Sequence, residues 1–193
     1  ILVARGAAKV PRPRLGIGQD TFVKIETVEA RRAQRSRWSA GGTLHRPEWD
    51  RIRTAGAWAL RAFQARIKRI ALINGQEGLD NPRDRLRGYK QALASNDLAY
   101  DPDLVHYGNW EPSSGYEKTH ALMKMKNPPD GIFCANDLMA LGCIEALKEL
   151  GKSIPRDVSV VGFDNVAEAE FVRPRLTTVD THARQLGATA ATL

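Results

Sequence analysis

Hydrophobic and polar positions are most clearly patterned between residues 129 and 164, where two apolar runs flank a helical one. Gly131–Cys134 is a short apolar run of the kind found in buried strands. Leu138–Leu150 is a continuous run without proline, and Gly151 follows it at the position where a left-handed residue commonly ends a helix. Val158–Phe163 is a second strand-like run. The pattern predicts a β-α-β unit with parallel strands and a right-handed crossover.

The same alternation of strand-like and helical runs extends upstream. Arg69–Asn74 is an apolar strand-like run. Asn81 and Pro82 predict a helix start, with Asn81 as the N-cap and Pro82 as the first helical residue. A further strand is expected at Leu104–Tyr107, and Pro112 is expected to open the next helix, which should direct Tyr116 and Met123 inward.

The segment after residue 164 continues this order with a short extended stretch at Leu176–Val179 and a final helix from about Ala183 to the end. From residue 69 to residue 163 the expected order is β-α-β-α-β-α-β with short connections. Such alternation is typical of an α/β fold, an open and mostly parallel doubly wound sheet flanked by helices on both faces.

The first third of the chain lacks this regularity. Residues 1–48 show little apolar periodicity apart from weak alternation at Phe22–Ile25, whereas Thr54–Arg66 is expected to form a helix. We therefore expect two regions: residues 1–66, an irregular basic segment that forms a partial or distorted N-terminal subdomain, and residues 67–193, an α/β subdomain.

The formal net charge of +7 comes from that first third. Residues 1–66 contain 14 lysines and arginines against 5 aspartates and glutamates, whereas residues 67–193 contain 15 against 17. Within the basic region, Arg31–Trp38 combines cations with an aromatic side chain and could follow a phosphate backbone, but a solvated segment fits the same pattern. The region with clear fold signals is slightly acidic, so net charge does not predict nucleic-acid binding for it.

Targeting signals are not apparent. No run of 18 apolar residues occurs, which predicts no membrane span. The first residues lack an apolar segment followed by a cleavage site, so we expect a cytoplasmic protein. Cys134 and Cys143 form no CxxC motif and fit packed, reduced thiols in that compartment.

Catalytic motifs are also not apparent. The sequence has no nucleophile-elbow motif, phosphate-binding loop or dinucleotide-binding glycine motif. Asp137 and Asp164 could act as an acid–base pair, but no nucleophile or cofactor loop accompanies them. We expect no enzyme activity, no cofactor and no metal site. The four histidines lack metal-ligand spacing: His45, His106, His120 and His182.

Polar side chains follow each predicted strand, at the edge where open α/β sheets bind ligands. Their amide, carboxylate and guanidinium groups, with one indole ring, suit a polyhydroxylated or heterocyclic ligand. Structural alternatives remain: Asn136 or Asp137 could only cap a helix, Asp164 could only form a turn, and Trp110 could be packed core. Arg85 could simply be balanced by surface aspartates. The residues that follow the strands are Glu77, Asp80, Asn81, Arg85, Asn109, Trp110, Asn136, Asp137, Asp164 and Asn165.

Three segments resemble the effector domain of the LacI/GalR family of transcriptional regulators. They are ANDLMALG at 135–142, IPRDVSVVGFDN at 154–165 and RPRLTTVD at 173–180. Their order and spacing carry the resemblance, which covers roughly residues 67–190. It implies a periplasmic-binding-protein-like fold whose N-terminal subdomain is incomplete here, and a small effector, a sugar or related metabolite, that modulates binding to operator DNA.

The resemblance also implies roles for individual residues. Arg85 in RLRGY matches the arginine that clamps the effector, and Trp110 in GNWEPSSGY matches the aromatic residue that stacks on it. Asn136 in AND and Asp164 in GFDN match polar effector contacts.

Related regulators dimerise through the helix that corresponds to Leu138–Leu150 and through the segment near Val172. The resemblance therefore implies a homodimer with Leu138, Leu141 and Val172 at its interface. No helix-turn-helix pattern is found in residues 1–60, so operator DNA would be bound through a helix-turn-helix outside this chain. Two alternatives remain: a sugar-binding protein of an ABC transporter, which would need an export signal, and a truncated, non-functional remnant, which the irregular first 48 residues suggest.

Overall fold

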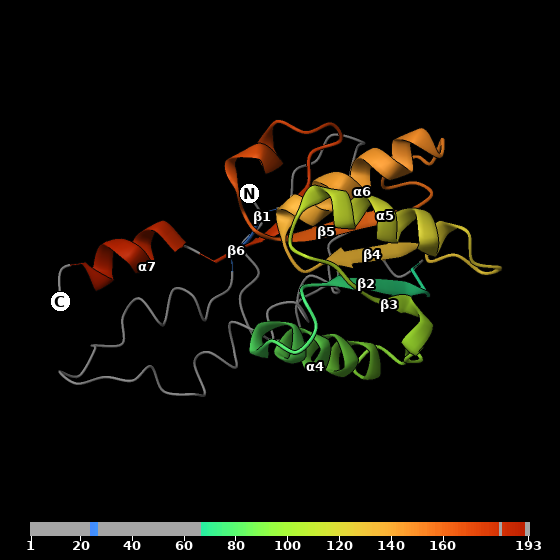
Figure 1. Cartoon of the computed structure of the whole chain (residues 1–193), viewed down its shortest axis with the longest axis horizontal. Coiled ribbons are helices and arrows are strands. Elements are labelled where there is room, and N and C mark those ends of the chain that lie inside the picture. Colours follow the sequence, from blue (N-terminus) through green and yellow to red (C-terminus); the bar gives the residue numbers. More distant parts are fainter. Residues whose placement is uncertain (1–23, 27–66, 182, 192–193) are drawn as a thin grey trace, which may run out of the picture.

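The computed structural model describes residues 24–26, 67–181 and 183–191. Figure 1 shows strands and helices alternating along this part of the chain. The elements are β1 (Lys24–Glu26), β2 (Ile70–Asn74), α4 (Asp80–Ala94), η1 (Pro102–Leu104), β3 (Val105–Tyr107), α5 (Pro112–Met123), β4 (Gly131–Cys134), α6 (Asp137–Glu149), β5 (Ser159–Asp164), η2 (Ala167–Glu170), β6 (Thr177–Asp180) and α7 (Ala183–Ala190). The predicted β-α-β alternation is confirmed.

The six strands in the described part of the chain form one parallel sheet in the order β1-β6-β5-β4-β2-β3. The α/β prediction is therefore confirmed. From β2 the chain runs outward to β3 at one edge, and it then crosses back to β4 on the other side of β2. The remaining described strands, β5 and β6, continue in that second direction. The direction of winding thus reverses between β2 and β4, whose strands pair from Ile70 with Gly131 to Ile73 with Cys134.

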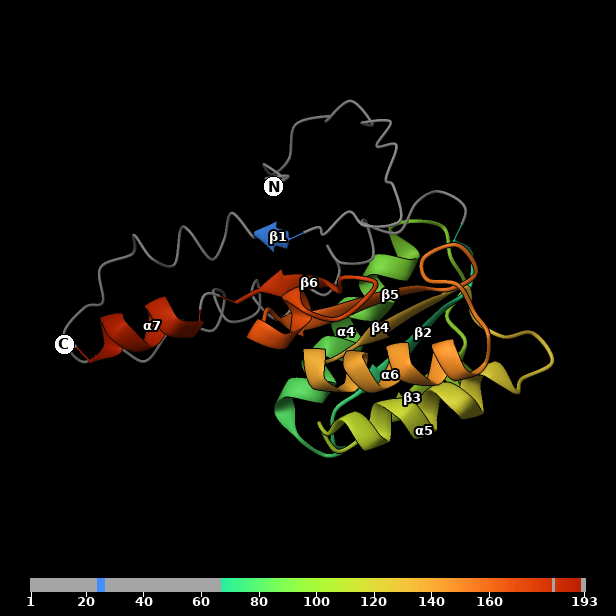
Figure 2. The same cartoon turned by 90° about the horizontal axis from the view of Figure 1, so that it is seen from above.

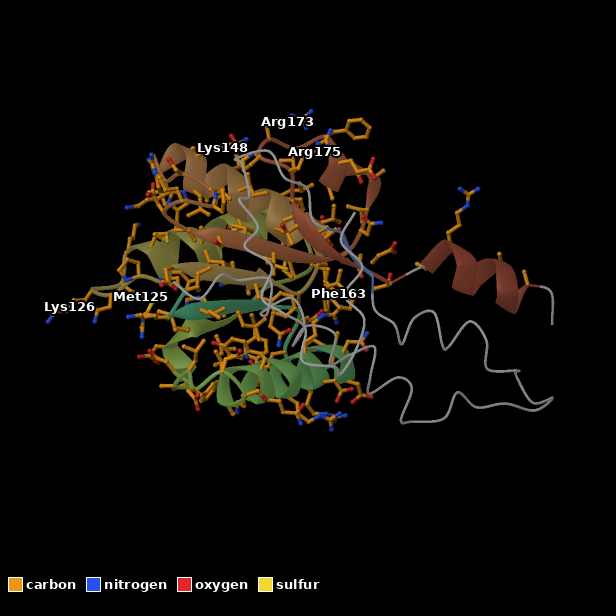
Figure 3. The ribbon with its side chains drawn as sticks, turned by 180° about the vertical axis from the view of Figure 1, so that it is seen from behind. Met125, Lys126, Lys148, Phe163, Arg173 and Arg175 are labelled. Atoms are coloured by element: carbon orange, nitrogen blue, oxygen red, sulfur yellow. The ribbon has the colours of Figure 1, made fainter. Side chains whose placement is uncertain are left out.

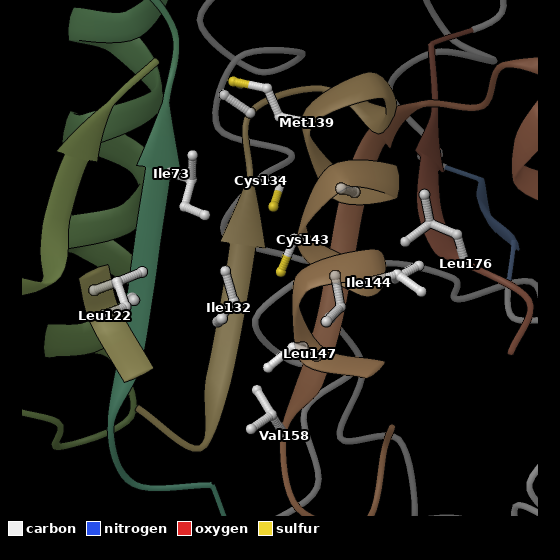
Figure 4. Close-up of a cluster of buried hydrophobic side chains, with 14 of the residues drawn as sticks. Ile73, Leu122, Ile132, Cys134, Met139, Cys143, Ile144, Leu147, Val158 and Leu176 are labelled. Carbon is white, nitrogen blue, oxygen red and sulfur yellow. The ribbon is translucent and has the colours of Figure 1, made fainter. Parts of the chain in front are cut away.

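Helices cover the two faces of the sheet separately. Figures 1 and 2 show α5 and α6 on one face and α4 on the other. Each face has its own core of buried side chains, because strands in such a sheet are apolar on both sides. The core beneath α6 includes Cys134 and Cys143, which are buried free thiols as expected (Figure 4). The core beneath α4 includes Tyr89, Phe133 and Phe163.

Two glycines allow α5 and α6 to approach each other closely. A Cβ atom on Gly115 would overlap the backbone of Met139, and one on Gly142 would overlap the carbonyl of Pro112. The two helices therefore pack backbone to backbone. This close contact fixes the start of α5 against the first turns of α6, and both of these helix starts lie near the carboxyl ends of the strands.

The predicted N-cap of α4, Asn81, was wrong by two residues. The helix begins at Asp80, and Leu79 occupies the N-cap position without a side-chain hydrogen bond. Pro82 is the third helical residue rather than the first, and it is tolerated there because the first N–H groups of a helix have no intrahelical partner to lose. A polar side chain from outside the helix contacts this helix start: the Nδ2 of Asn74 donates to the carbonyl of Pro82 over 2.8 Å.

Other boundaries shifted slightly. Leu104 belongs to the 3₁₀ turn η1, which Asp101 caps by accepting from the N–H of Asp103 over 3.0 Å, so the strand begins at Val105. In α5 the buried positions are Ser114, Gly115, Thr119 and Leu122, whereas Tyr116 and Met123 are only partly buried. The inward direction predicted for Tyr116 was therefore wrong, because its hydroxyl hydrogen-bonds Glu149 at the surface.

The N-terminal expectations fall mostly outside the described residues, including the helix expected at 54–66 and the basic stretch at 31–38. The described strand Lys24–Glu26 pairs with β6 at the edge of the sheet, overlapping the weakly alternating stretch. Among the described helices, none is long and apolar enough to cross a membrane.

Candidate functional site

The predicted site residues belong to loops and helix starts at the carboxyl ends of β2 to β5. Asn74 is the last residue of β2 and is fully buried at this edge of the sheet. Its side-chain Nδ2 donates to the carbonyl of Pro82 in α4, and its side-chain Oδ1 accepts from the N–H of Gly75 over 3.0 Å. Asn74 thus fastens the loop after β2 to the start of α4. Sequence reasoning missed this role, although an asparagine that ends an apolar strand was a visible signal.

Arg85 in α4 directs a buried guanidinium toward this edge. The residue is 9% exposed, and its Cζ lies 4.2 Å from the ring centroid of Phe163 and 5.7 Å from that of Trp110. Its Nε has no hydrogen-bond partner among the residues that the structure describes. Burial lowers the pKa of Arg85 from its ordinary value, and the nearby charge of Asp164 opposes that shift. The guanidinium remains a cation, and both aromatic rings lie within cation–π distance of it.

Trp110 is held in an unusual backbone conformation, with a φ of 73°. Its indole ring covers Gly75, where a Cβ atom would overlap the ring. Its carbonyl accepts a hydrogen bond from the Nδ2 of Asn136 over 2.8 Å. The same Asn136 caps α6, because its Oδ1 accepts from the N–H of Met139 over 2.9 Å. Asn136 therefore links the loop that carries Trp110 to the start of α6.

Asp164 ends β5 with a φ of 118°, and Asn165 follows with a φ of 63°. Both lie in the left-handed half of backbone space that non-glycine residues seldom adopt. The pKa of Asp164 is raised from 3.8 to about 6, first because burial disfavours the carboxylate and then because Asp137 repels it, while Arg85 opposes the shift. In the sheet, Asp164 is paired in register with Asp180 of β6.

Asp137, the first residue of α6, hydrogen-bonds to the loop that follows Asp164. Its carboxylate is fully buried and accepts from the hydroxyl of Thr178 over 2.6 Å and from the N–H of Val166 over 2.9 Å. Gly162 leaves room for it, since a Cβ atom there would overlap the carboxylate. Burial raises the pKa of Asp137, and these hydrogen bonds oppose the rise. The carboxylate thus joins α6, β6 and the loop after β5.

The structure brings Arg85, Trp110 and Asp164 together around one edge and places Asn136 behind Trp110. Phe163 was not among the predicted residues, because an apolar strand residue gives no polar signal. Several other strand-end residues have local roles or are exposed. Asp80 pairs with Arg83 on the surface of α4. Asn109 is an exposed turn residue whose Oδ1 accepts from the N–H of Glu111.

The three predicted interface residues lie on the surface formed by α6 and the segment after η2. Leu138, Leu141 and Val172 are partly exposed, and the adjacent Phe171 is 77% exposed. Within the described ranges, no group of three or more histidine, cysteine, aspartate or glutamate side chains could hold a metal ion.

Residues 61–193 match the family of periplasmic binding protein-like domains. The HTH-type transcriptional repressor PurR of Histophilus somni is 37% identical over 126 residues, which are 65% of this chain and 38% of that protein. The chain thus spans less than two fifths of the length of that relative.

Solved structures show the same relationship. The Escherichia coli transcriptional repressor ascG has a TM-score of 0.63 at 34% identity, covering 70% of this chain and 51% of that one. The transcriptional regulator CelR in complex with cellobiose has a TM-score of 0.62 at 28% identity, covering 89% of this chain and 46% of that one.

Proposed function

The chain belongs to the family of periplasmic binding protein-like domains, among the effector domains of LacI/GalR regulators, and from that premise we propose that it binds a small effector on behalf of a DNA-binding transcriptional regulator. The observation that carries this proposal is the convergence of Arg85, Trp110 and Asp164 at the carboxyl edge of the sheet. That edge includes the point between β2 and β4 where the winding reverses, and open α/β sheets bind ligands at such points.

The chemistry of these side chains favours a sugar or a related metabolite. Trp110 offers an apolar ring face, Arg85 offers planar donors, and Asp164 offers an acceptor with a raised pKa. A ring that carries hydroxyl or ring-nitrogen groups would stack on the indole while it bonds both charged groups. Asn136 was predicted as a further polar contact to the effector. Its side-chain amide also donates to the backbone carbonyl of Trp110, which holds the loop that carries the indole ring.

The effector would act by population shift. If it binds one arrangement of the effector domain more tightly than another, its binding free energy biases the equilibrium between them. We propose that this bias changes operator affinity through a helix-turn-helix outside this chain. We also propose a cytoplasmic homodimer whose interface includes Leu138, Leu141 and Val172, and binding rather than catalysis as its activity. The transporter alternative is not favoured, because the relatives and neighbouring structures are transcriptional repressors and regulators.

Calorimetry with purified full chain tests the binding proposal. The ligand panel would contain free sugars, with cellobiose among them, and nitrogen heterocycles. Trp110→Ala should weaken binding by about 1–3 kcal/mol, the usual range for a buried aromatic anchor. Arg85→Ala should weaken it comparably, and Arg85→Lys should not restore it, because an ammonium cannot replace a planar fork.

The matched control is Arg83→Ala, on the same helix. The Arg83 side chain is 70% exposed and pairs with Asp80 at the surface, so its loss should leave affinity unchanged. Binding that survives both Arg85→Ala and Trp110→Ala would refute the proposed site. Failure of the whole panel to bind would count against effector binding by this chain.

A further inference from the structure

Phe163 is the feature of the site that the proposed function has not yet used. It is 4% exposed, lies in the core beneath α4, and is the residue immediately before Asp164 in β5. Figure 3 labels it near the end of this strand. Strand residues alternate between faces, so Phe163 and Asp164 point in opposite directions from one strand end. The Phe163 ring nevertheless lies close to Arg85, whose charge acts on Asp164.

Of the two rings near the guanidinium of Arg85, that of Phe163 is the nearer. Arg85 Cζ lies 4.2 Å from the Phe163 ring centroid, against 5.7 Å for Trp110. A buried guanidinium is ordinarily oriented by hydrogen bonds to carboxylates or carbonyls. Here Nε has no such partner among the described residues. A planar cation can instead be held flat by an aromatic face, which leaves its N–H groups free to point outward along its edge.

We propose that Phe163 is a positioning residue, whose ring face fixes the guanidinium plane of Arg85 so that its donors point to the effector at the strand-end site. This inference rests on the proposed function for its ligand, but the orientation itself exists without ligand. Phe163 acts through Arg85 and need not touch the effector. Its contribution is to the direction of the donors rather than to their charge.

The chain offers a matched control for this role. Phe133 of β4 is fully buried in the same core as Phe163, but the described rings near the Arg85 guanidinium are those of Phe163 and Trp110. Phe163→Leu and Phe133→Leu therefore remove a ring from the same core, and only the first removes the surface beneath the guanidinium. Phe163→Tyr keeps that ring face and serves as the conservative variant.

The first measurement needs no ligand: the pKa of the Asp164 carboxyl, followed by carbon-13 NMR through a pH titration of the full chain. Burial and the charge of Asp137 raise this pKa to about 6, while Arg85 holds it down. If Phe163→Leu releases the guanidinium, the Asp164 pKa rises above that of the wild type. Phe163→Tyr and Phe133→Leu should leave it unchanged. An Asp164 pKa that stays at the wild-type value in Phe163→Leu overturns the proposal.

A second measurement uses the wild-type chain and so does not depend on a variant that folds. A guanidinium fixed over a ring face has its Nε proton shifted upfield by the ring current. The Arg85 Nε–H resonance should therefore lie clearly upfield of that of exposed Arg83. If the two resonances coincide, Arg85 is not held on the ring and the proposal fails.

Calorimetry with cellobiose then separates this inference from the proposed function. If wild type binds cellobiose, Phe163→Leu should lower the affinity about tenfold, which corresponds to about 1.4 kcal/mol, while Phe163→Tyr and Phe133→Leu stay within about twofold. Equal affinity in Phe163→Leu and Phe133→Leu would overturn the positioning role. If cellobiose does not bind but both NMR results hold, the orientation of Arg85 stands and cellobiose is removed as the effector.

Discussion

Replacement of Asp137 by asparagine should destabilise the chain, because this buried carboxylate joins three elements. It accepts from Thr178 over 2.6 Å and from Val166 over 2.9 Å. Asparagine keeps the shape but replaces one acceptor oxygen with an NH₂ group, so one of the two donors loses its partner. An unsatisfied buried donor costs about 1–3 kcal/mol. Loss of the negative charge from the first turn of α6 adds about 0.3–1 kcal/mol.

One contribution to the free energy of unfolding opposes this loss of stability. Burial raises the pKa of Asp137, so the neutral asparagine avoids part of the cost of burying a charge. We therefore expect a net loss of about 2 kcal/mol, equivalent to a fall in Tm of about 4–8 °C for a chain of this size. Urea unfolding followed by circular dichroism measures the free energy. The control is Asp97→Asn, an exposed position with a φ of 56° that asparagine tolerates.

The same variant has a second, electrostatic consequence. The charge of Asp137 raises the pKa of Asp164, so Asp137→Asn should lower the Asp164 pKa below about 6. Loosening the loop would also lower the Asp164 pKa, because burial is the main cause that raises it, so the fall is assigned to the charge of Asp137 only if the NMR resonances of the folded loop match those of the wild type. Stability equal to that of Asp97→Asn, or an Asp164 pKa that does not fall, would refute the reasoning about this carboxylate.

Three further predictions concern packing, pH and assembly. Gly142→Ala should lower the free energy of unfolding in urea by about 1–3 kcal/mol, because the new Cβ overlaps the Pro112 carbonyl. The control Gly187→Ala has open space around the new Cβ and should raise that free energy by up to about 1 kcal/mol. Equal effects of the two variants would refute the close helix contact. Folding raises the Asp164 pKa from 3.8 to about 6, so the protonated carboxyl is favoured in the folded state. The free energy of unfolding should therefore fall by at most about 3 kcal/mol as pH rises from about 4 to about 6. Asp164→Asn should remove this dependence of the unfolding free energy on pH. Leu141→Asp should shift sedimentation toward monomer, and an unchanged mass would exclude Leu141 from the proposed interface.

Much of the parallel sheet could be predicted from apolar runs because its central strands are buried on both faces. Gly131–Cys134 coincides with β4, and Ile70–Asn74 differs from the predicted strand by one residue. Gly151, with a φ of 67°, follows α6 as predicted, since glycine adopts that conformation without strain. The cap of α4 could not be located from Asn81 and Pro82, because the observed N-cap, Leu79, has no side chain that can cap a helix and so gives no sequence signal.

The site was harder to predict than the fold. The rule that ligands bind at strand ends selected Arg85, Trp110 and Asp164 as candidates from chain order alone, and the structure places them near one another. It could not locate Phe163, which lies in an apolar strand and contributes a ring face rather than a polar group. It also gave no indication of the left-handed conformations at Trp110 and Asn165, since neither is glycine.

The left-handed conformations of Trp110 and Asn165 indicate a structural role for the start of α6. Backbone in this region costs about 1–3 kcal/mol per residue and persists only where surrounding contacts hold it. Two consecutive side chains supply such contacts: Asn136 holds the carbonyl of Trp110, and Asp137 holds the N–H of Val166, just after Asp164. The first turn of α6 therefore fastens both loops that carry the proposed ligand contacts. On this basis, we propose that Asn136 and Asp137 serve the proposed site by holding the loops that carry Trp110 and Asp164.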